Sequence, residues 1–303
     1  MKKRLILFLM LLVLVISGCS NQESNATADK SKTDTITYES ENGAVEVPAD
    51  PKRVIVLSTF TGNVMALDVN LVGVDGWSKD NPRFEEDLKD VEEVTDESLE
   101  KIIELEPDLI IGLANIKNID KLNEIAPTVT YTYGKADYLE QHIEIGKLLN
   151  KEQEARDWVE DFKKRAQKSG KKIKDKIGAD STVSVIENFD KQLYVFGDNW
   201  GRGTEILYQE MELKMPEKVK EMALDEGYYA ISSELLPEFS GDYIVFSKNK
   251  DTDTSFQKTD TYKNIPAVKN DQVLEVNAKE FYFNDPITLD FQLDYFTDYF
   301  LGE

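Results

Sequence analysis

The middle of the chain contains one long amphipathic helix. Between residues 152 and 177, apolar side chains recur at spacings of three and four in an otherwise charged stretch, which is the pattern of a helix with one buried stripe. The stripe consists of Ala155, Trp158, Val159, Phe162, Ala166, Ile173 and Ile177. Gly170 weakens the middle of this helix and allows a bend or a break there. This helix lies between the two halves of the chain and is long enough to bridge them.

Both halves alternate between strand and helix patterns. A continuous apolar run such as residues 54–57 is typical of a buried parallel strand. Expected strands are 54–57, 69–74, 108–111, 128–133, 182–186, 192–196, 243–246 and 273–276, and expected helices are 62–67, 98–106, 119–125, 204–211, 232–239 and 287–300. The alternation predicts an α/β protein with mostly parallel sheets.

A short motif occurs once in each half. Glu100 precedes Asp108 by eight positions, and Glu234 precedes Asp242 by the same eight. In both cases an apolar strand segment follows the aspartate. This repetition predicts two similarly built lobes joined by the long helix.

The N-terminus has the features of an export signal. Three basic residues precede an apolar run at 5–16, which is too short to span a bilayer, and Ser17, Gly18 and Cys19 follow. Residues 16–19 resemble the lipobox of bacterial lipoproteins, in which the cysteine is lipidated and becomes the new N-terminus. A plain signal peptide remains the alternative. Residues 20–35 are almost entirely polar, which predicts a flexible tether.

Composition excludes several classes of function. Removing residues 1–19, which hold three basic and no acidic side chains, changes the formal net charge from −22 to −25. Such an acidic protein repels phosphate backbones, so we expect no nucleic acid partner. Cys19 is the only cysteine, so no disulfide is expected. His142 is the only histidine, which disfavours a multi-imidazole metal site or a serine hydrolase triad, and we place it on an exposed helix face.

One glycine-rich turn concentrates residues suited to binding. Glycines at 197, 201 and 203 follow the expected strand 192–196 and allow a sharp turn that presents Trp200 and Arg202. In open α/β sheets, ligands bind at the ends of strands. Tryptophan supplies a large apolar face, and arginine supplies fixed donors for anionic or carbonyl oxygens. The sequence contains no phosphate-binding loop and no nucleophile elbow, so an enzyme is not supported.

This turn belongs to a set of motifs that resembles one family. Residues 194–203 (Tyr-Val-Phe-Gly-Asp-Asn-Trp-Gly-Arg-Gly) and 281–286 (Phe-Tyr-Phe-Asn-Asp-Pro) are similar to the ferric hydroxamate siderophore-binding lipoproteins of Gram-positive ABC importers. Further agreement comes from 51–54 (Pro-Lys-Arg-Val), 106–111 (Glu-Pro-Asp-Leu-Ile-Ile), 126–129 (Ala-Pro-Thr-Val) and 241–245 (Gly-Asp-Tyr-Ile-Val). The resemblance implies two Rossmann-like α/β lobes bridged by a long α-helix, the class III periplasmic-binding-protein fold. The implied bounds are 36–148 for the first lobe, 149–178 for the helix and 179–303 for the second lobe.

The resemblance also implies a shallow cleft that holds one ferric siderophore. The matching cleft positions are Tyr133, Tyr194, Trp200, Arg202 and Tyr282, and two further N-lobe candidates are Phe60 and Arg83. A close relative carries tryptophan at the position of Tyr282, so ligand preference can differ there. The expected ligand is of the ferrichrome or ferrioxamine type. Haem, cobalamin or a ferric catecholate on the same fold is the alternative, and a tethered carbohydrate-active enzyme is a more distant one.

The chemistry of such a chelate explains why histidine is dispensable. Hydroxamate oxygens fill all six iron positions, so the protein needs no metal ligand and no cofactor. Ferric trihydroxamates are neutral or singly cationic, which suits an acidic protein better than a highly anionic catecholate. Arg202 can donate to the hydroxamate oxygens, and the aromatic residues can cover the apolar linkers.

The resemblance finally implies a transport system. Glu100 and Glu234 match the surface glutamates that dock against arginines of the membrane permease, which works with its ATPase. Two ordinary helix glutamates are the alternative. We therefore expect a monomeric receptor on the extracellular face of the cell membrane, anchored through a lipid on Cys19.

Overall fold

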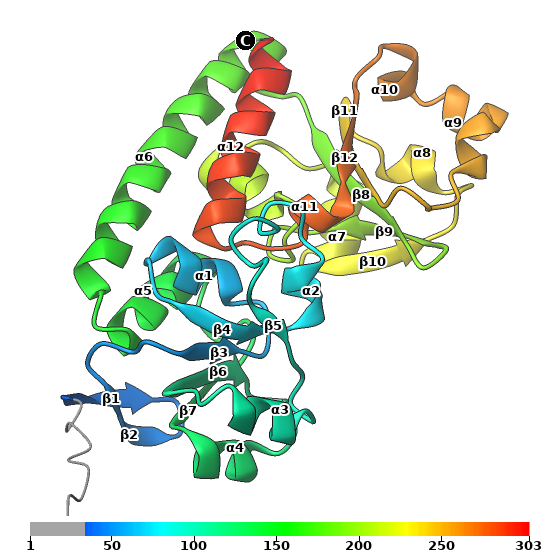
Figure 1. The fold of residues 1–303 in the computed structure, drawn as a ribbon. Helices are drawn as coiled ribbons and strands as arrows, with labels where there is room; N and C mark the ends of the chain where they lie inside the picture. The colour runs from blue at the N-terminus through cyan, green and yellow to red at the C-terminus, as the bar shows by residue number, and fades with distance from the viewer. Residues whose placement is uncertain (1–33, 303) are drawn as a thin grey trace, which may run out of the picture. The chain divides into compact units, whose positions relative to one another are not determined.

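The computed structural model describes residues 34–302 (Figure 1). The first lobe contains a five-stranded parallel sheet of order β5-β4-β3-β6-β7. Its strands are β3 (Val54–Val56), β4 (Leu71–Val74), β5 (Glu92–Glu93), β6 (Leu109–Leu113) and β7 (Thr128–Tyr131). Its helices are α1 (Thr61–Ala66), α2 (Gly76–Lys79), α3 (Leu99–Glu104), α4 (Ile119–Ile125) and α5 (Tyr138–Leu148). The alternation expected from the sequence is confirmed here.

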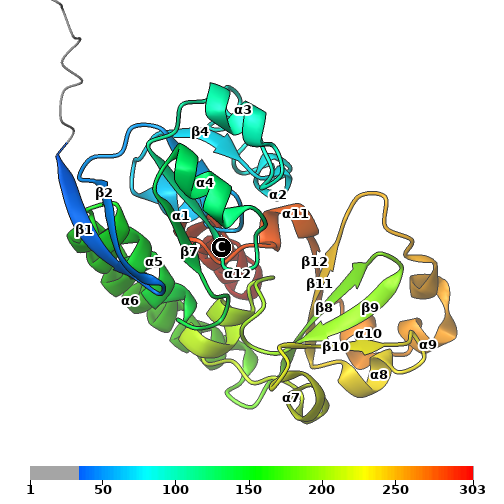
Figure 2. The same ribbon diagram turned by 90° about the horizontal axis from the view of Figure 1, so that it is seen from below.

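Helices cover both faces of this sheet. Alternate residues of a strand point to opposite faces, so Val54 and Val56 pack on the side of α1 and α5, while Ile55 packs with Ile102 of α3 and Leu122 of α4. Figure 2 shows α3 and α4 on the near side of the sheet. Burial on both faces accounts for the continuous apolar runs in these strands.

An antiparallel hairpin precedes the first sheet, and the sequence analysis did not predict it. Its strands are β1 (Thr35–Ser40) and β2 (Gly43–Pro48). It packs against β7, where Tyr38 Oη lies 3.1 Å from Tyr131 Oη. β1 begins at Thr35, the last residue of the predicted tether. The predicted signal peptide, Cys19 and residues 20–33 of the tether lie outside the described residues.

The second lobe has a mixed sheet of order β10-β9-β8-β11-β12. Its strands are β8 (Val183–Phe189), β9 (Gln192–Phe196), β10 (Tyr228–Ile231), β11 (Tyr243–Lys248) and β12 (Val273–Asn277). The β8-β11 and β11-β12 pairs are parallel, whereas β8-β9 and β9-β10 are antiparallel. Only two residues, Asp190 and Lys191, connect β8 to β9, and both have positive φ, at 46° and 69°. A two-residue connection permits only an antiparallel hairpin, so the expectation of parallel pairing does not hold at this edge.

The helices of the second lobe are mostly short. They are the π-helical segment η1 (Glu205–Glu210), α7 (Glu217–Ala223), α8 (Leu236–Phe239), the 3₁₀ turn η2 (Ser255–Lys258), α9 (Asp260–Lys263), α10 (Pro266–Lys269), α11 (Ala278–Phe281) and the longer α12 (Pro286–Leu301). Among residues 34–302, no helix is both long enough and apolar enough to cross a membrane.

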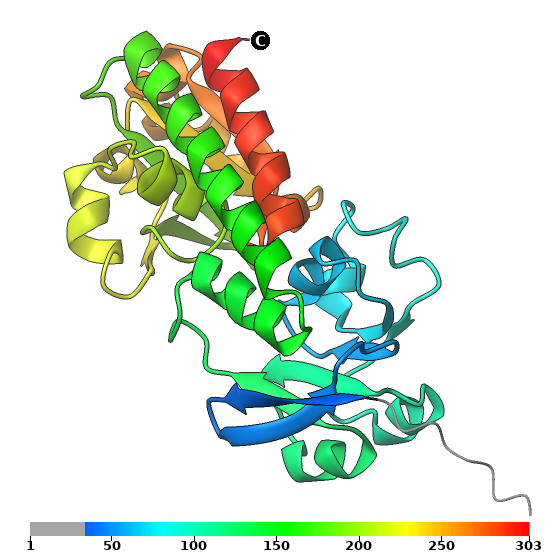
Figure 3. The same ribbon diagram turned by 90° about the vertical axis from the view of Figure 1, so that its left-hand side faces the viewer.

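The bridging helix α6 runs from Glu152 to Ile177 without interruption. The break that Gly170 allowed is absent because this glycine serves close packing instead: a Cβ added there would lie 2.5 Å from the Cα of Met211. Figure 3 shows α6 alongside α12. Asp290 of α12 joins the two helices, since it accepts hydrogen bonds from Trp158 Nε1 at 3.0 Å and Arg165 Nη2 at 2.6 Å.

His142 is buried, with 1% of its surface exposed, so its predicted position on an exposed helix face was wrong. Its helix α5 is packed against both α1 and α6. Nδ1 of His142 lies 3.3 Å from Nδ2 of Asn63, and the imidazole packs edge-on against Trp158 at 5.3 Å. The residues next to His142 in the sequence are polar, so the sequence indicated an exposed position. The burial comes from α1 and α6, which local sequence does not reveal.

The sequence motif repeated in the two halves has a common structural role. Asp108 accepts hydrogen bonds from the backbone N–H groups of Lys52 and Arg53, which lead into β3. Asp242 accepts one from the backbone N–H of Thr182, which leads into β8. Each aspartate therefore ties the entry of one parallel strand to its neighbour. The repeated motif has the same role in both lobes, although only the first sheet is parallel throughout.

Candidate functional site

A cavity of about 580 Å³ is lined by residues of both lobes. The first lobe contributes Thr59, Phe60, Tyr133, Gly134, Ala136, Asp137, Tyr138 and Gln141, and the second contributes Asp198, Asn199, Trp200, Glu205, Gln209, Asp225, Glu226 and Asn284. These residues come mainly from loops that follow β3, β7 and β9. The carboxyl ends of strands are the usual ligand-binding edge of α/β sheets.

Aromatic rings form one wall of this cavity. Trp200 lies edge-on to Tyr133 with ring centroids 5.3 Å apart, and on its other side it contacts Tyr228 at 5.1 Å. Tyr194 packs edge-on to Tyr228 at 5.9 Å. The structure thus brings together three predicted residues, Tyr133, Tyr194 and Trp200; Tyr133 and Trp200 line the cavity, whereas Tyr194 lies behind them against Tyr228. Tyr228, which links them, was missed because β10 had not been recognised as a strand.

The turn after β9 has an unusual backbone. Gly201, Arg202 and Gly203 all have positive φ, between 61° and 82°. The turn is pressed against the segment before α12: a Cβ on Gly201 would lie 2.3 Å from the carbonyl oxygen of Tyr282, and Arg202 N donates to Phe281 O at 2.7 Å. These contacts hold the backbone of Arg202 in the left-handed conformation, which residues other than glycine adopt only at an energetic cost.

Arg202 forms an ion pair with the buried carboxylate of Glu187. Nε and Nη2 of Arg202 each lie 3.1 Å from a carboxylate oxygen of Glu187, and Nη1 donates to the carbonyl of Trp200 at 3.0 Å. Ser247 Oγ also donates to Glu187, at 2.7 Å. Glu187 is wholly inaccessible to solvent. Its charge therefore neutralises that of Arg202, which lies behind Trp200 and lines neither this cavity nor a second, smaller one.

Tyr282 belongs to a second, smaller cavity of about 400 Å³. Its lining residues are Gly76, Trp77, Asp80, Glu93, Phe189, Asn249, Lys279 and Tyr282. The ring of Tyr282 lies 4.9 Å from the guanidinium carbon of Arg202, whose Nη1 bonds to Trp200 in the wall of the first cavity. Arg202 thus connects the walls of the two cavities.

The two lower-ranked candidates occupy different places. Phe60 lines the first cavity although it is largely buried, and it packs edge-on to Tyr131 at 5.5 Å. Arg83 lines neither cavity. Its guanidinium lies 4.3 Å above the ring of Phe291 on α12.

The first cavity is acidic. Five carboxylate side chains line it, from Asp137, Asp198, Glu205, Asp225 and Glu226, while none of its described lining residues is Lys or Arg. Burial raises the pKa of Glu205, and hydrogen bonds from the N–H of Gly201 and from Asn284 partly offset this rise. The arrangement favours a neutral or cationic ligand over an anionic one. Within residues 34–302, no group of three or more His, Cys, Asp or Glu side chains is placed to hold a metal ion.

Glu100 and Glu234 lie on different lobes, and both side chains are exposed. Each has a large exposed apolar neighbour: Ile103, 56% exposed, lies one turn after Glu100 on α3, and Leu235, 39% exposed, directly follows Glu234. An acidic side chain beside an exposed aliphatic one therefore occurs once on each lobe.

The fold and its interlobe cavity define a class of binding protein. Residues 54–280 match the family model described as periplasmic binding protein, and this chain belongs to that family.

Individual relatives are similar over nearly the whole length. The iron(3+)-hydroxamate-binding protein FhuD of Bacillus subtilis strain 168 is 38% identical over 96% of this chain and 95% of its own. The iron(3+)-hydroxamate-binding protein YxeB of the same organism is 37% identical over 98% and 97%. Among solved structures, FhuD2 from Staphylococcus aureus with bound ferrioxamine B superimposes with a TM-score of 0.79 at 35% identity, covering 83% of this chain and 99% of that one.

Proposed function

We propose that this protein captures a ferric hydroxamate siderophore outside the cell and delivers it to an ABC permease. Family membership and the two iron(3+)-hydroxamate-binding relatives support this function. The main structural support for this function is the charge of the cavity. The interlobe cavity is lined by aromatic rings and carboxylates, and the adjoining Arg202 is already neutralised by Glu187.

This charge pattern selects among iron chelates. Three hydroxamate groups balance the charge of Fe³⁺, so the complex is neutral or, with an additional amine, singly cationic. A ferric catecholate carries several negative charges and would meet five carboxylates with no free cation among the lining residues. The cavity therefore suits the hydroxamate class, and the siderophore itself supplies all of the iron ligands.

The predicted residues divide the work of recognition. A guanidinium has five N–H donors, of which Glu187 and the carbonyl of Trp200 engage three, so two remain for hydroxamate oxygens. Tyr133, Tyr194 and Trp200 cover the apolar linkers of the chelate from one side. Phe60 completes the wall of the first cavity, Tyr282 lines the second, and Arg83 acts from outside by holding α12 through Phe291.

A ligand panel tests this proposal. Ferrioxamine B, added at about 100 times its dissociation constant, should stabilise the protein by about 2.7 kcal/mol and raise its melting temperature. It should also quench tryptophan fluorescence, because Trp200 lies in the cavity wall. Replacing Trp200 by Phe should remove part of this quenching. The proposal fails if ferric hydroxamates change neither signal while haem, cobalamin or a ferric tris-catecholate changes both.

We also propose that the receptor is a monomer tethered to the membrane through lipidated Cys19. Tethering raises the concentration of receptor at its permease. Metabolic labelling with a radioactive fatty acid should mark the wild type and leave Cys19→Ala unlabelled. Equal labelling of both would refute the anchor.

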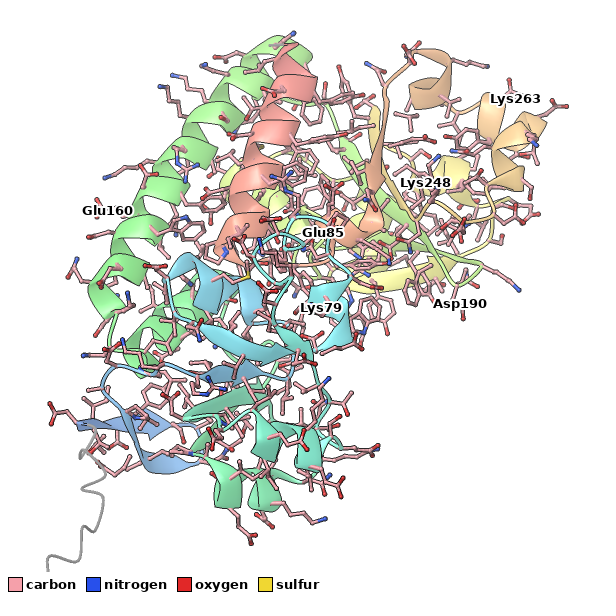
Figure 4. The ribbon with its side chains drawn as sticks, viewed as in Figure 1. Lys79, Glu85, Glu160, Asp190, Lys248 and Lys263 are labelled. Atoms are coloured by element: carbon pink, nitrogen blue, oxygen red, sulfur yellow. The ribbon has the colours of Figure 1, made fainter. Side chains whose placement is uncertain are left out.

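Docking to the permease is assigned to the two acidic and apolar pairs, Glu100 with Ile103 and Glu234 with Leu235. Apolar side chains beside the charges would add buried contact area to an otherwise orienting interaction. Reversing both charges, Glu100→Lys with Glu234→Lys, should abolish uptake and preserve ligand affinity. Glu160→Lys is the control, since Glu160 lies on the outer face of α6 (Figure 4). Normal uptake by the double variant would contradict this docking role.

A further inference from the structure

The second cavity, bounded by Trp77, Phe189 and Tyr282, has the composition of a cation site. Trp77 is 54% exposed and Phe189 beside it is 37% exposed, so the two rings together present an apolar surface to solvent. Its ring stacks on Phe189 at 6.3 Å and meets Tyr282 edge-on at 5.2 Å. Trp77 belongs to the first lobe and its two partners to the second, so the aromatic surface spans the lobes.

Two carboxylates line this cavity, and they differ in their partners. Asp80 forms an ion pair with Lys279 at 2.8 Å, which is also a lining residue. Glu93 forms no ion pair with any residue of the described chain, and its Oε1 would lie 3.0 Å from a Cβ added to Gly76 at the cavity edge. The three charged lining residues therefore sum to one negative charge, which Glu93 carries.

An unused hydrogen-bond acceptor adds a second and independent indication. Asn249 lines the cavity, and its Nδ2 donates to Tyr282 Oη at 3.0 Å. Its Oδ1 is buried and has no partner. A buried acceptor without a donor is energetically unfavourable, so a small rotation of the Asn249 side chain that turns Oδ1 toward an N–H group of a ligand would be favoured.

We propose that this cavity is a subsite for a protonated amine on an arm of the bound siderophore. Aromatic faces, one unpaired carboxylate and one free amide oxygen are the groups that recognise an organic ammonium ion. Tyr282 lines this cavity and also contacts Arg202, so an arm leaving a chelate at Arg202 enters beside Tyr282. This inference rests on the proposed function and adds that cationic hydroxamate chelates are preferred to neutral ones.

A pair of ligands that differ only in this charge tests the subsite. Ferrioxamine B has a terminal primary amine, and acetylation of that amine removes its charge without altering the iron centre. Calorimetric titration of the wild type should show ferrioxamine B binding about fivefold to tenfold more tightly than its N-acetylated form. In Glu93→Gln the ratio should fall to about one, chiefly through weaker binding of ferrioxamine B. In Glu93→Lys the preference should reverse.

Glu160→Gln provides the matched control, because it makes the same charge change on the outer face of α6 (Figure 4), and it should keep the wild-type ratio. Equal affinity of the wild type for both chelates, or equal weakening of both in Glu93→Gln, would overturn the subsite while leaving the receptor function intact. Failure of the wild type to bind either chelate would instead refute the proposed function and, with it, this inference.

Discussion

Replacing His142 by asparagine should change how the stability of the protein depends on pH. His142 is the only histidine, so no other imidazole contributes to the effect. Burial between α1, α5 and α6 lowers its pKa to about 4, and its Nε2 has no hydrogen-bond partner. Asparagine at this position can still accept a hydrogen bond from Asn63 but does not take up a proton in this range.

The sign of the effect follows from the direction of the pKa shift. An unfolded histidine titrates near 6.5, so the unfolded chain binds the proton before the folded one does. The contribution of neutral His142 to stability is therefore complete above about pH 6.5 and is lost as the pH falls through 4. A difference of this size corresponds to about 3 kcal/mol, of which roughly 2–3 kcal/mol is lost between pH 7.5 and 4.5.

Urea unfolding at pH 7.5, 5.5 and 4.5 measures this effect. His142→Asn should be less stable than the wild type at pH 7.5, because the smaller side chain leaves a cavity. At pH 4.5 the difference should shift by roughly 2–3 kcal/mol in favour of the variant. Asp285→Asn is a control of opposite sign: burial raises the pKa of Asp285 to about 6, so the stability contribution of Asp285 is lost as the pH rises through 6. A stability difference for His142→Asn that is independent of pH would refute this reasoning.

Three further substitutions test close packing, charge pairing and strand entry in the two lobes. Gly62→Ala should destabilise the protein by roughly 1–3 kcal/mol in urea unfolding, because the new Cβ would lie 1.9 Å from Asp285 Oδ1; an unchanged midpoint would contradict this close contact. Glu187→Gln should lower stability by roughly 3–5 kcal/mol, because it leaves the charge of Arg202 without its partner. The same change should raise the affinity for anionic ferric chelates. Calorimetry that shows unchanged selectivity among chelates would argue against neutralisation of Arg202 by Glu187. Asp108→Ala should lower stability by roughly 1–3 kcal/mol through two lost backbone hydrogen bonds, and a thermal melt like that of the wild type would exclude this role.

Regular local patterns made much of the fold predictable. The bounds of α4, α6 and β9 agree with the sequence prediction at both ends. In α6 the reason is that a single buried stripe repeats over seven turns of charged sequence. The hairpin of β1 and β2 was missed although Asn42 and Gly43 mark its turn, and β10 was missed because Tyr228, Tyr229 and Ala230 show no alternation of burial.

Residues of the candidate site could be predicted only where they belong to a local sequence motif. Trp200 and Arg202 stand in a glycine-rich turn after a strand, so their position near the cleft followed from local sequence. Glu187 could not be found in this way, because it lies within the apolar run of β8 and acquires its role only through a partner fifteen residues later. Trp77 had one available signal, a tryptophan in a polar segment, but its aromatic partners belong to the other lobe.

The sequence alone determined the α/β class, the bridging helix, the repeated glutamate and aspartate motif and the resemblance to siderophore receptors. These properties depend on periodicity and short motifs, which act between residues close together in the chain. Tertiary structure alone decided that His142 is buried, that Glu187 neutralises Arg202, and that Trp77 and Tyr282 share a second cavity. Each of these depends on contacts between segments that are not adjacent in the chain, so the burial and the charge balance arise only when the helices and strands pack together.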